Sequence, residues 1–203
     1  MKRLMPIAAT LLLALTACSD VESDDNYNEH EVMTTVNLIF ASSAEGAEDL
    51  VFTWADPEAD GSPVIDDIVL ENGVDYAVSV EIWNELEETP EEVTPELLDE
   101  DDEHQAFFTG SAVEGPATGA NEAALVTHAY ADSDRNGLPI GLENEISAVA
   151  TGAGELTFTL RHMPPENGNP VKIEGLAEDV AEGGFEAIGG ANDIQVTYSV
   201  TVE

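Results

Sequence analysis

Apolar and polar residues alternate with a period of two along most of the chain after residue 31. Five segments show the alternation clearly: 32–40, 50–54, 76–82, 156–160 and 194–202. Four more show it weakly: 64–70, 105–109, 123–131 and 144–151. Such alternation is typical of half-buried β-strands, and the Gly, Asn, Asp and Pro clusters between the segments are typical of turns. The pattern therefore predicts a chain of short strands.

Eight or nine short strands within 31–203 favour an all-β domain. We predict a single antiparallel β-sandwich of immunoglobulin-like or Greek-key type, with an open barrel as the alternative. A domain of this size buries roughly 70% of its unfolded surface, so its core suffices without disulfides. The chain has one cysteine, which excludes a disulfide framework.

One connection carries helix signals instead of strand signals. Thr89-Pro90-Glu91-Glu92 and then Thr94-Pro95-Glu96 each combine a capping residue, a proline at the first helical position and early acidic residues. We expect a short helical connection near 89–103, and a second helical stretch near 176–181. Between residues 85 and 103, 11 of 19 residues are acidic, which indicates a solvated segment.

The N-terminus has the composition of an export signal. Lys2 and Arg3 precede a twelve-residue apolar stretch, 4–15, which is too short to span a bilayer but suits a signal peptide. The stretch ends in Leu15-Thr16-Ala17-Cys18, which resembles the lipobox of bacterial lipoproteins. The alternative is a secretory signal cut at another small residue.

The resemblance implies that 1–17 is a lipoprotein signal peptide and that Cys18 carries the lipid, which includes palmitate. Several acyl chains on one residue anchor a protein stably. Residues 18–30 are then an acidic, disordered tether. Ser19 after the cysteine favours the outer membrane, where the protein would face the periplasm or the cell surface.

The net charge of the chain excludes some classes of binding partner. The chain has 43 Asp and Glu against 5 Lys and Arg, a net charge of −38, and loss of Lys2 and Arg3 with the signal makes it −40. A chain this acidic does not neutralise nucleic-acid phosphates, and we expect membrane contact through the lipid alone. The surplus fits either adaptation to a salty environment or a surface for cations or basic partners.

The segment from Asp132 to Glu143 has the spacing of a calcium loop, D-x-[DN]-x-[DN]-G-x5-E. Calcium takes six to eight oxygen ligands, so carboxylates at alternating positions around a glycine turn can surround one ion. By analogy the ligands would be Asp132, Asp134, Asn136, the backbone carbonyl of Leu138, and Glu143. The flanks have strand patterns, so the alternative is a polar turn between strands.

A looser version of the same pattern follows the strand at 50–54. It contains Asp56, Glu58 and Asp60, with Asp67 at the corresponding end position. Two such loops favour calcium a little more than one does. In a chain so rich in Asp, however, the coincidence is also expected by chance.

The four histidines are His30, His104, His128 and His162. They show no close ligand spacing, so a zinc or haem site would have to be assembled across strands. We therefore expect structural roles for them, in buried polar clusters or ion pairs. Arg161 is one of three basic residues after the signal, and we expect it to neutralise nearby carboxylates.

Several short segments also resemble a group of small, acidic, uncharacterised bacterial lipoproteins. The segments are 29–35, 52–57, 102–108 and 160–162, spread over nearly the full mature chain. Members are often labelled as proteins of the type 1 periplasmic binding fold, which implies two α/β lobes, whereas the periodicity favours strands. The resemblance implies a family of lipoproteins and supplies neither a ligand nor a mechanism.

Three functional hypotheses follow. The first is a lipid-anchored, non-catalytic binding or interaction module of the cell envelope, stabilised by calcium if the loops bind it. The second is a periplasmic receptor for a solute or a metal. The third is a carboxylate-dependent envelope hydrolase, which would need converging acids of perturbed pKa in a cleft.

Overall fold

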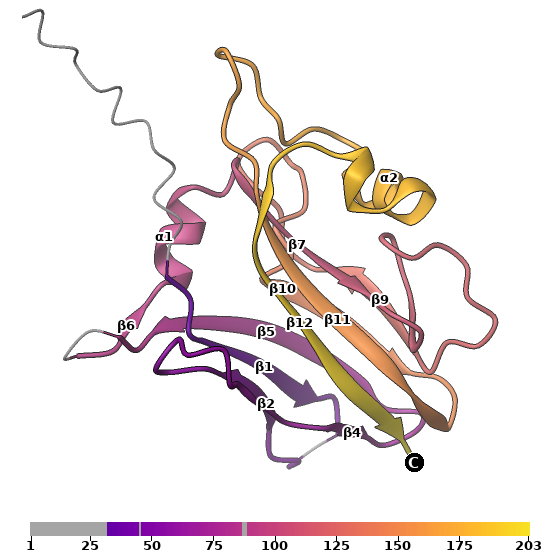
Figure 1. Cartoon of the computed structure of the whole chain (residues 1–203). Coiled ribbons are helices and arrows are strands. Elements are labelled where there is room, and N and C mark those ends of the chain that lie inside the picture. Colours follow the sequence, from indigo (N-terminus) through magenta and orange to yellow (C-terminus); the bar gives the residue numbers. More distant parts are fainter. Residues whose placement is uncertain (1–31, 45, 87–88) are drawn as a thin grey trace, which may run out of the picture.

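The computed structural model describes residues 32–44, 46–86 and 89–203 (Figure 1). The predictions for the signal peptide, Cys18 and the tether lie outside these residues. Within the described ranges, every helix is too short or too polar to cross a membrane.

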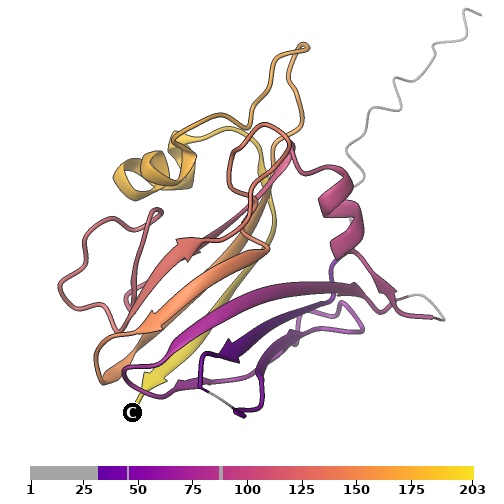
Figure 2. The same ribbon diagram turned by 180° about the vertical axis from the view of Figure 1, so that it is seen from behind.

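The fold is mostly β, with two sheets. The larger sheet has the strand order β3-β2-β1-β5-β10-β9-β8, with β6 beside β5, and it curls into a half-barrel (Figures 1 and 2). Its strands are β1 (Thr35–Ser42), β2 (Leu50–Ala55), β3 (Val64–Ile65), β5 (Asp75–Asn84), β6 (Glu91–Glu92), β8 (Val113–Glu114), β9 (Val126–Tyr130) and β10 (Glu143–Ala148).

The smaller sheet has the strand order β4-β12-β11-β7. Its strands are β4 (Ile68–Leu70), β7 (His104–Thr109), β11 (Gly152–His162) and β12 (Ala191–Val202). The mostly-β prediction is confirmed, and each predicted segment contains a strand. The prediction that all pairing is antiparallel is wrong in two places, because β4 pairs in parallel with β12 and β8 with β9. These pairings are only two or three residues long, which periodicity does not reveal.

The hydrophobic core lies between the sheets. Alternate residues along most of β1, β5 and β12 are buried, as the period-two pattern requires, whereas β11 is buried on both faces from residue 158 to residue 161. The largest fully buried side chains include Phe40, Phe108, Phe158 and Tyr198. Phe108 and Phe158 meet edge to face, with ring centroids 5.5 Å apart. Apolar burial by residues of both sheets is therefore the main stabilising contribution.

Two helices lie toward one end of the sheets, and the C-terminus lies toward the other (Figures 1 and 2). Helix α1 (Thr94–Asp99) begins at the second of the two predicted starts, with Pro95 in its first turn. The first start is wrong, because Glu91 and Glu92 pair with β5 as β6. Thr94 does not cap the helix through its side chain. Its hydroxyl accepts the amide of Ile82 at 2.9 Å and so ties α1 to β5.

Helix α2 (Leu176–Gly183), followed by a 3-10 turn (Phe185–Ala187), confirms the predicted helical stretch near 176–181. It packs Leu176, Ala177 and Val180 against Phe107 of β7 in a second apolar cluster. Strand β7 is therefore covered on both sides, by the main core and by α2. This double burial explains why every residue of β7 except the last is buried, His104 and Gln105 included.

A β-bulge interrupts the pairing of β11 and β12. Leu160 pairs with Ile194, whereas Arg161 pairs with Asn192, so Asp193 is the extra residue. A bulge redirects a side chain that would otherwise alternate with its neighbours. The Asp193 side chain is 2% exposed, and it lies against His104.

Candidate functional site

The loop from Asp132 to Glu143 connects β9 to β10, and its first carboxylate binds backbone amides. Asp132 Oδ1 accepts the amide of Gly141 at 2.7 Å, and Oδ2 accepts those of Leu142 and Glu143 at 2.8 and 2.9 Å. Both carboxylate oxygens are thus used to close the loop. This is the behaviour of Asp as a capping residue in a turn.

Asp134 is the second carboxylate of the loop, and its side chain is fully buried. Its Oδ1 accepts the amides of Asn136 and Leu138, each at 2.8 Å. Its Oδ2 lies 2.9 Å from the ammonium nitrogen of Lys172, whose side chain is also fully buried. Burial pushes the pKa of Asp134 upward, but the Leu138 amide and Lys172 outweigh it and hold that pKa below its usual value. A lysine therefore stands where a loop-bound cation would stand.

The remaining predicted ligands of this loop do not converge. The Leu138 carbonyl accepts the amide of Asp134 at 2.7 Å. Asn136 and Glu143 are exposed residues. The carboxyl group of Glu143 is still partly desolvated, and this desolvation, together with the charge of Asp132, raises its pKa. Calcium binding at this loop stays a prediction, and it would require displacement of Lys172.

The second acidic loop, at 56–67, is closed in the same way. The carboxylate of Asp56 accepts the amides of Asp60 and Gly61 at 3.1 and 2.9 Å, and Asp60 accepts the amide of Ser62 at 2.9 Å. Glu58 and Asp67 are exposed. These are the contacts of a polar turn, and calcium binding here also stays a prediction.

Two histidines meet at the end of the smaller sheet. His104 begins β7 and His162 ends β11, and the two residues are direct cross-strand partners. Their rings stack, with centroids 4.4 Å apart and planes 12° from parallel. Both residues continue the core-facing positions of their strands, so the hydrophobic core ends in a pair of imidazoles. This is the cross-strand assembly that a histidine site in this sequence requires.

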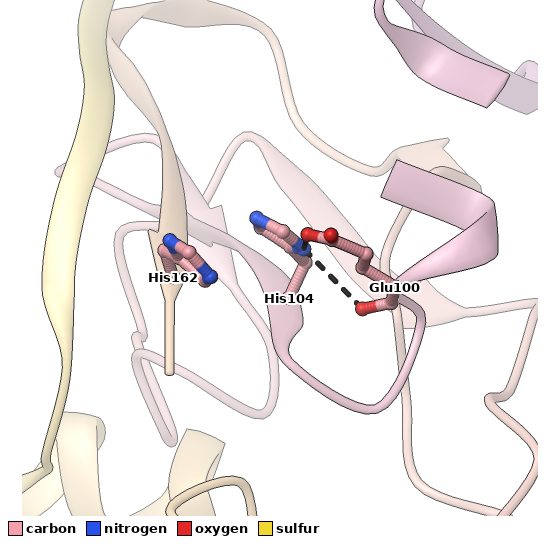
Figure 3. Close-up of side chains that lie close together, drawn as sticks. All are labelled: Glu100, His104 and His162. Carbon is pink, nitrogen blue, oxygen red and sulfur yellow. Dashed lines mark hydrogen bonds and ion pairs between the residues drawn. The ribbon is translucent and has the colours of Figure 1, made fainter. Parts of the chain in front are cut away.

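Three carboxylates surround this pair. Glu100, just after α1, places a carboxylate oxygen 4.0 Å from His104 Nδ1. Asp193 places one 3.7 Å from His104 Nε2, and Glu103 places one 3.5 Å from His162 Nε2. Figure 3 shows the His104 ring between His162 and Glu100. The exposed fractions of the side chains rise from 2% for His104 and Asp193 to 54% for Glu100, so the cluster opens to solvent on one side.

His104 faces oxygen acceptors on both ring nitrogens. Nδ1 lies 3.3 Å from the backbone oxygen of Glu100, and Nε2 faces Asp193. A neutral imidazole has one N–H, so it can donate to only one of these acceptors. Burial, and then the neighbouring His162, lower the pKa of His104 to about 4, which disfavours a second proton. A cation bound at one nitrogen would remove this conflict.

Among the described residues, Glu100, His104 and His162 form the group whose potential ligand atoms all lie within 4.8 Å of one another. Two imidazole nitrogens and a carboxylate oxygen are the ligand types of many zinc and other transition-metal sites. The cluster contains no thiolate and no closed set of oxygens. Its chemistry therefore fits a transition-metal ion better than calcium.

His128 has a structural environment. Its Nε2 lies 2.9 Å from Asn144 Oδ1, and its ring packs against Phe108 and Tyr130. Burial lowers its pKa, which keeps the imidazole neutral. The prediction of a buried polar role is confirmed for this histidine, and His30 lies outside the described residues.

Arg161 departs from its predicted role. Its guanidinium donates to the backbone oxygens of Gly189 at 2.6 Å and Gly190 at 2.9 Å, and to the Asn192 side chain at 2.7 Å. It also lies over the Phe185 ring, 5.6 Å from the centroid. The arginine therefore holds the segment between α2 and β12 and binds carbonyl oxygens instead of carboxylates, because the strand directs it away from the acidic turn beside His162.

Two hollows lie at the far end of the larger sheet. One of about 510 Å³ runs over β1, β5 and β10 and is lined by Asp75, Tyr76 and Glu145 among others. The other, of about 370 Å³, shares Ser42 and Tyr76 with it. Their linings contain acids and small residues but no histidine. The histidine cluster is therefore the place in the described chain where metal-ligand chemistry is concentrated.

No family model, no curated protein and no solved structure matches the chain.

The sequence pointed to both histidines and to Glu103 in a buried polar cluster, but it gave no sign of Glu100 and Asp193. One signal was available: His104 and His162 continue the alternation of apolar residues in their strands, which places both on the core face. The bulge that turns Asp193 inward has no such signal. Neither does the pairing of β7 with β11, because the two strands lie more than forty residues apart.

Proposed function

We propose that the protein is a lipid-anchored cell-envelope protein whose folded part binds one divalent transition-metal ion, of the zinc class. His104, His162 and Glu100 would be the protein ligands. The observation that carries the proposal is the stacked pair of buried imidazoles with a carboxylate within 4.8 Å. Metal binding is the activity that this arrangement supports.

The charge of the cluster supports a cation. Glu100, Glu103 and Asp193 bring three carboxylates to one partly buried place. Bringing like charges together in a poorly hydrated site is costly, and a divalent ion offsets much of that cost. The second nitrogens of the ligating rings would keep Asp193 and Glu103 as partners. Carboxylates at those positions orient metal-bound histidines and raise their basicity.

Metal binding requires a small rearrangement. The nitrogen lone pairs lie in the ring planes, and the planes of the two stacked rings are nearly parallel with centroids 4.4 Å apart, so one ion cannot lie in both planes. One imidazole must therefore turn for both to ligate the same ion. His162 is the more exposed of the two, at 11% against 2% for His104, and it ends its strand. It is the ring that we expect to turn.

We also propose that the two sheets form a β-sandwich, with α1 and the turn after it closing the end that carries the histidines. The lipobox Leu15–Cys18 supports an anchor in the outer membrane, with the domain facing the periplasm or the cell surface. The net charge of −38 supports an aqueous surface that does not bind nucleic acid.

Metal titration tests the binding proposal. The full-length protein, carrying Cys18→Ser to exclude thiol ligation, is titrated with Co²⁺ and followed by its visible absorption, and Zn²⁺ is then used as a competitor. We expect one equivalent to bind. The double variant His104→Gln/His162→Gln should lose at least 100-fold in affinity. His128→Gln, which removes a buried histidine outside the cluster, is the matched control and should bind as the parent does. Equal binding by all three proteins would overturn the proposal.

Labelling with a palmitate analogue in cells tests the anchor. The wild-type protein should incorporate the label and fractionate with membranes, whereas Cys18→Ala should do neither. Labelling that survives the substitution would rule out Cys18 as the lipidated residue.

A further inference from the structure

Basic residues are rare in this chain, so their positions are informative. After Arg3 the sequence contains only Arg135, Arg161 and Lys172, against 43 acidic residues in the whole chain. All three contact segments that border the histidine cluster. Arg161 precedes His162, and the other two bind the turn at 99–103 that carries Glu100 and Glu103.

Lys172 makes two contacts with its ammonium group. It donates to the backbone oxygen of Asp101 at 2.7 Å, and it pairs with Asp134 at 2.9 Å. Asp101 lies between Glu100 and the two residues that precede His104. The lysine thereby ties the turn at 99–103 to the β9–β10 loop and to its own segment. Its side chain is fully buried, so these contacts are not weakened by water.

Backbone hydrogen bonds hold the same turn from its other sides. Glu100 ends α1 through its amide, which donates to Glu96 at 3.0 Å, and Glu103 donates to the Glu100 carbonyl at 2.9 Å. The Met163 amide, next to His162, donates to the Glu103 carbonyl at 2.6 Å. Lys172 adds a buried side-chain contact at the centre of the turn.

We infer that Lys172 is the positioning residue of the metal centre. Through the Asp101 carbonyl it fixes the turn that presents Glu100 to His104 and Glu103 to His162, and Asp134 holds its ammonium group in place. The inference rests on the proposed metal binding at this cluster. It also assigns a role to the β9–β10 loop, which would serve the metal centre as the anchor of the lysine.

Arg135 contacts the same turn but is a weaker support. Its guanidinium pairs with the Asp101 carboxylate and lies 3.7 Å from Asp102, and it donates to the Asp99 carbonyl at 2.6 Å. Its side chain is 54% exposed, however, and exposed ion pairs contribute little. Arg135→Gln is therefore the matched control for Lys172, because it removes a basic contact to the turn without leaving a buried charge.

The test measures Co²⁺ affinity and the visible spectrum of the Co²⁺ complex in the full-length protein carrying Cys18→Ser. Lys172→Met alone would leave the Asp134 carboxylate buried and unpaired, so it is combined with Asp134→Leu to remove both charges. We expect the double variant to lose 10- to 100-fold in affinity, as substitutions behind metal ligands do. We also expect a changed spectrum, since Glu100 is no longer held. Arg135→Gln should lose less than threefold.

A double-mutant cycle separates positioning from general damage. If Lys172 acts through the turn, adding Lys172→Met/Asp134→Leu to Glu100→Gln should cost less than threefold further, because the ligand that it positions is already gone. An undiminished loss in the Glu100→Gln background would overturn the inference. Should the pair of substitutions prevent folding, the same cycle is run with Lys172→Arg, which keeps the charge.

The outcomes distinguish the two proposals. If the parent protein binds no Co²⁺ or Zn²⁺, the proposed function fails and the inference fails with it. If the parent binds and Lys172→Met/Asp134→Leu binds with the same affinity and the same spectrum, the metal centre stands and only the role of Lys172 is overturned.

Discussion

The β9–β10 loop and the histidine cluster lie on either side of Lys172, and their polar side chains differ in the partners that they find within the chain. In the loop, Asp132 and Asp134 direct their carboxylates at backbone amides and at a buried ammonium group. In the cluster, His104 has oxygen acceptors at both nitrogens and a single proton to share. The loop satisfies its carboxylates within the chain, whereas His104 faces an acceptor at each nitrogen and can donate to only one of them.

The difference shows why acid spacing alone is a weak indicator of a metal site. Asp residues at alternating positions around a glycine are equally suited to accept the amides of their own turn. What distinguishes a ligand set is that its donor atoms converge on one place. Those of Glu100, His104 and His162 all lie within 4.8 Å of one another, although the residues are scattered along the sequence.

The largest effect on stability is expected when Lys172, the buried cation of the loop, is replaced. Lys172→Met leaves the Asp134 carboxylate buried without its partner, which should cost about 3–5 kcal/mol of unfolding free energy. Urea unfolding of the full-length protein measures this cost. Adding Asp134→Leu should recover most of the loss. If Lys172→Met alone proves neutral, the pair does not hold the loop.

The next largest effect is expected from acid, which should lower the free energy of unfolding through the two regions in different pH ranges. In metal-free protein, burial and His162 lower the pKa of His104 to about 4, whereas an unfolded histidine titrates near 6.5. As the pH falls from about 6.5 to about 4, the unfolded chain gains a proton that the folded chain does not. Stability should therefore fall by up to roughly 3 kcal/mol over that window.

The loop responds at lower pH. Because the pKa of Asp134 is depressed in the folded state, its contribution is present above the unfolded value near 4 and is lost only below it. Urea midpoints between pH 7 and 3, taken in EDTA, measure both regions. His104→Asn should flatten the curve above pH 4 and leave the lower limb unchanged. An unaltered upper limb would contradict the assignment to His104.

A smaller effect is expected when the loop loses its closing carboxylate. Asp132→Ala removes the acceptor of three backbone amides, two of them in the buried residues Gly141 and Leu142, and should cost about 2 kcal/mol. Asp132→Asn, which keeps an acceptor oxygen, should cost less. Chemical denaturation measures both variants, and equal costs would show that a specific calcium or charge effect, and not amide capping, is the role of Asp132.

The smallest effect is expected from calcium itself. Thermal unfolding in CaCl₂, MgCl₂ and NaCl at matched ionic strength should give the same rise in midpoint, because the ions only screen the acidic surface. Glu143→Gln, at the end of the loop, should stay within about 0.5 kcal/mol of the parent. A rise specific to Ca²⁺ that Asp134→Ala abolishes would instead establish the calcium loop.

Much of the fold was predictable because burial on one face leaves a period-two pattern, as in β5 and β12. Helix α2 and the region of α1 were also predictable, from composition and proline placement. The short parallel pairings of β4 and β8 were not, since two or three residues show no period. The choice between the two helix starts depended on the pairing of Glu91 and Glu92 with β5, which is a tertiary contact.

The site was less predictable than the fold. Its histidines are 58 residues apart in sequence and meet because β7 and β11 pair in one register. Asp193 joins them through a bulge, and Glu100 through the turn after α1. Each of these depends on strand pairing or packing, which a single sequence does not reveal. The spacing of Asp132 to Glu143, by contrast, was visible in the sequence; its first two carboxylates accept amides of their own turn, and calcium binding there stays a prediction.

Anomalous X-ray scattering at the zinc edge, from crystals of the full-length Cys18→Ser protein grown with one equivalent of Zn²⁺, tests the central claim most directly. We predict one anomalous peak, about 2.1 Å from a nitrogen of His104 and from a nitrogen of His162, with a Glu100 oxygen at a similar distance. A peak between Asp132 and Asp134, or a cluster without any peak, would contradict the claim.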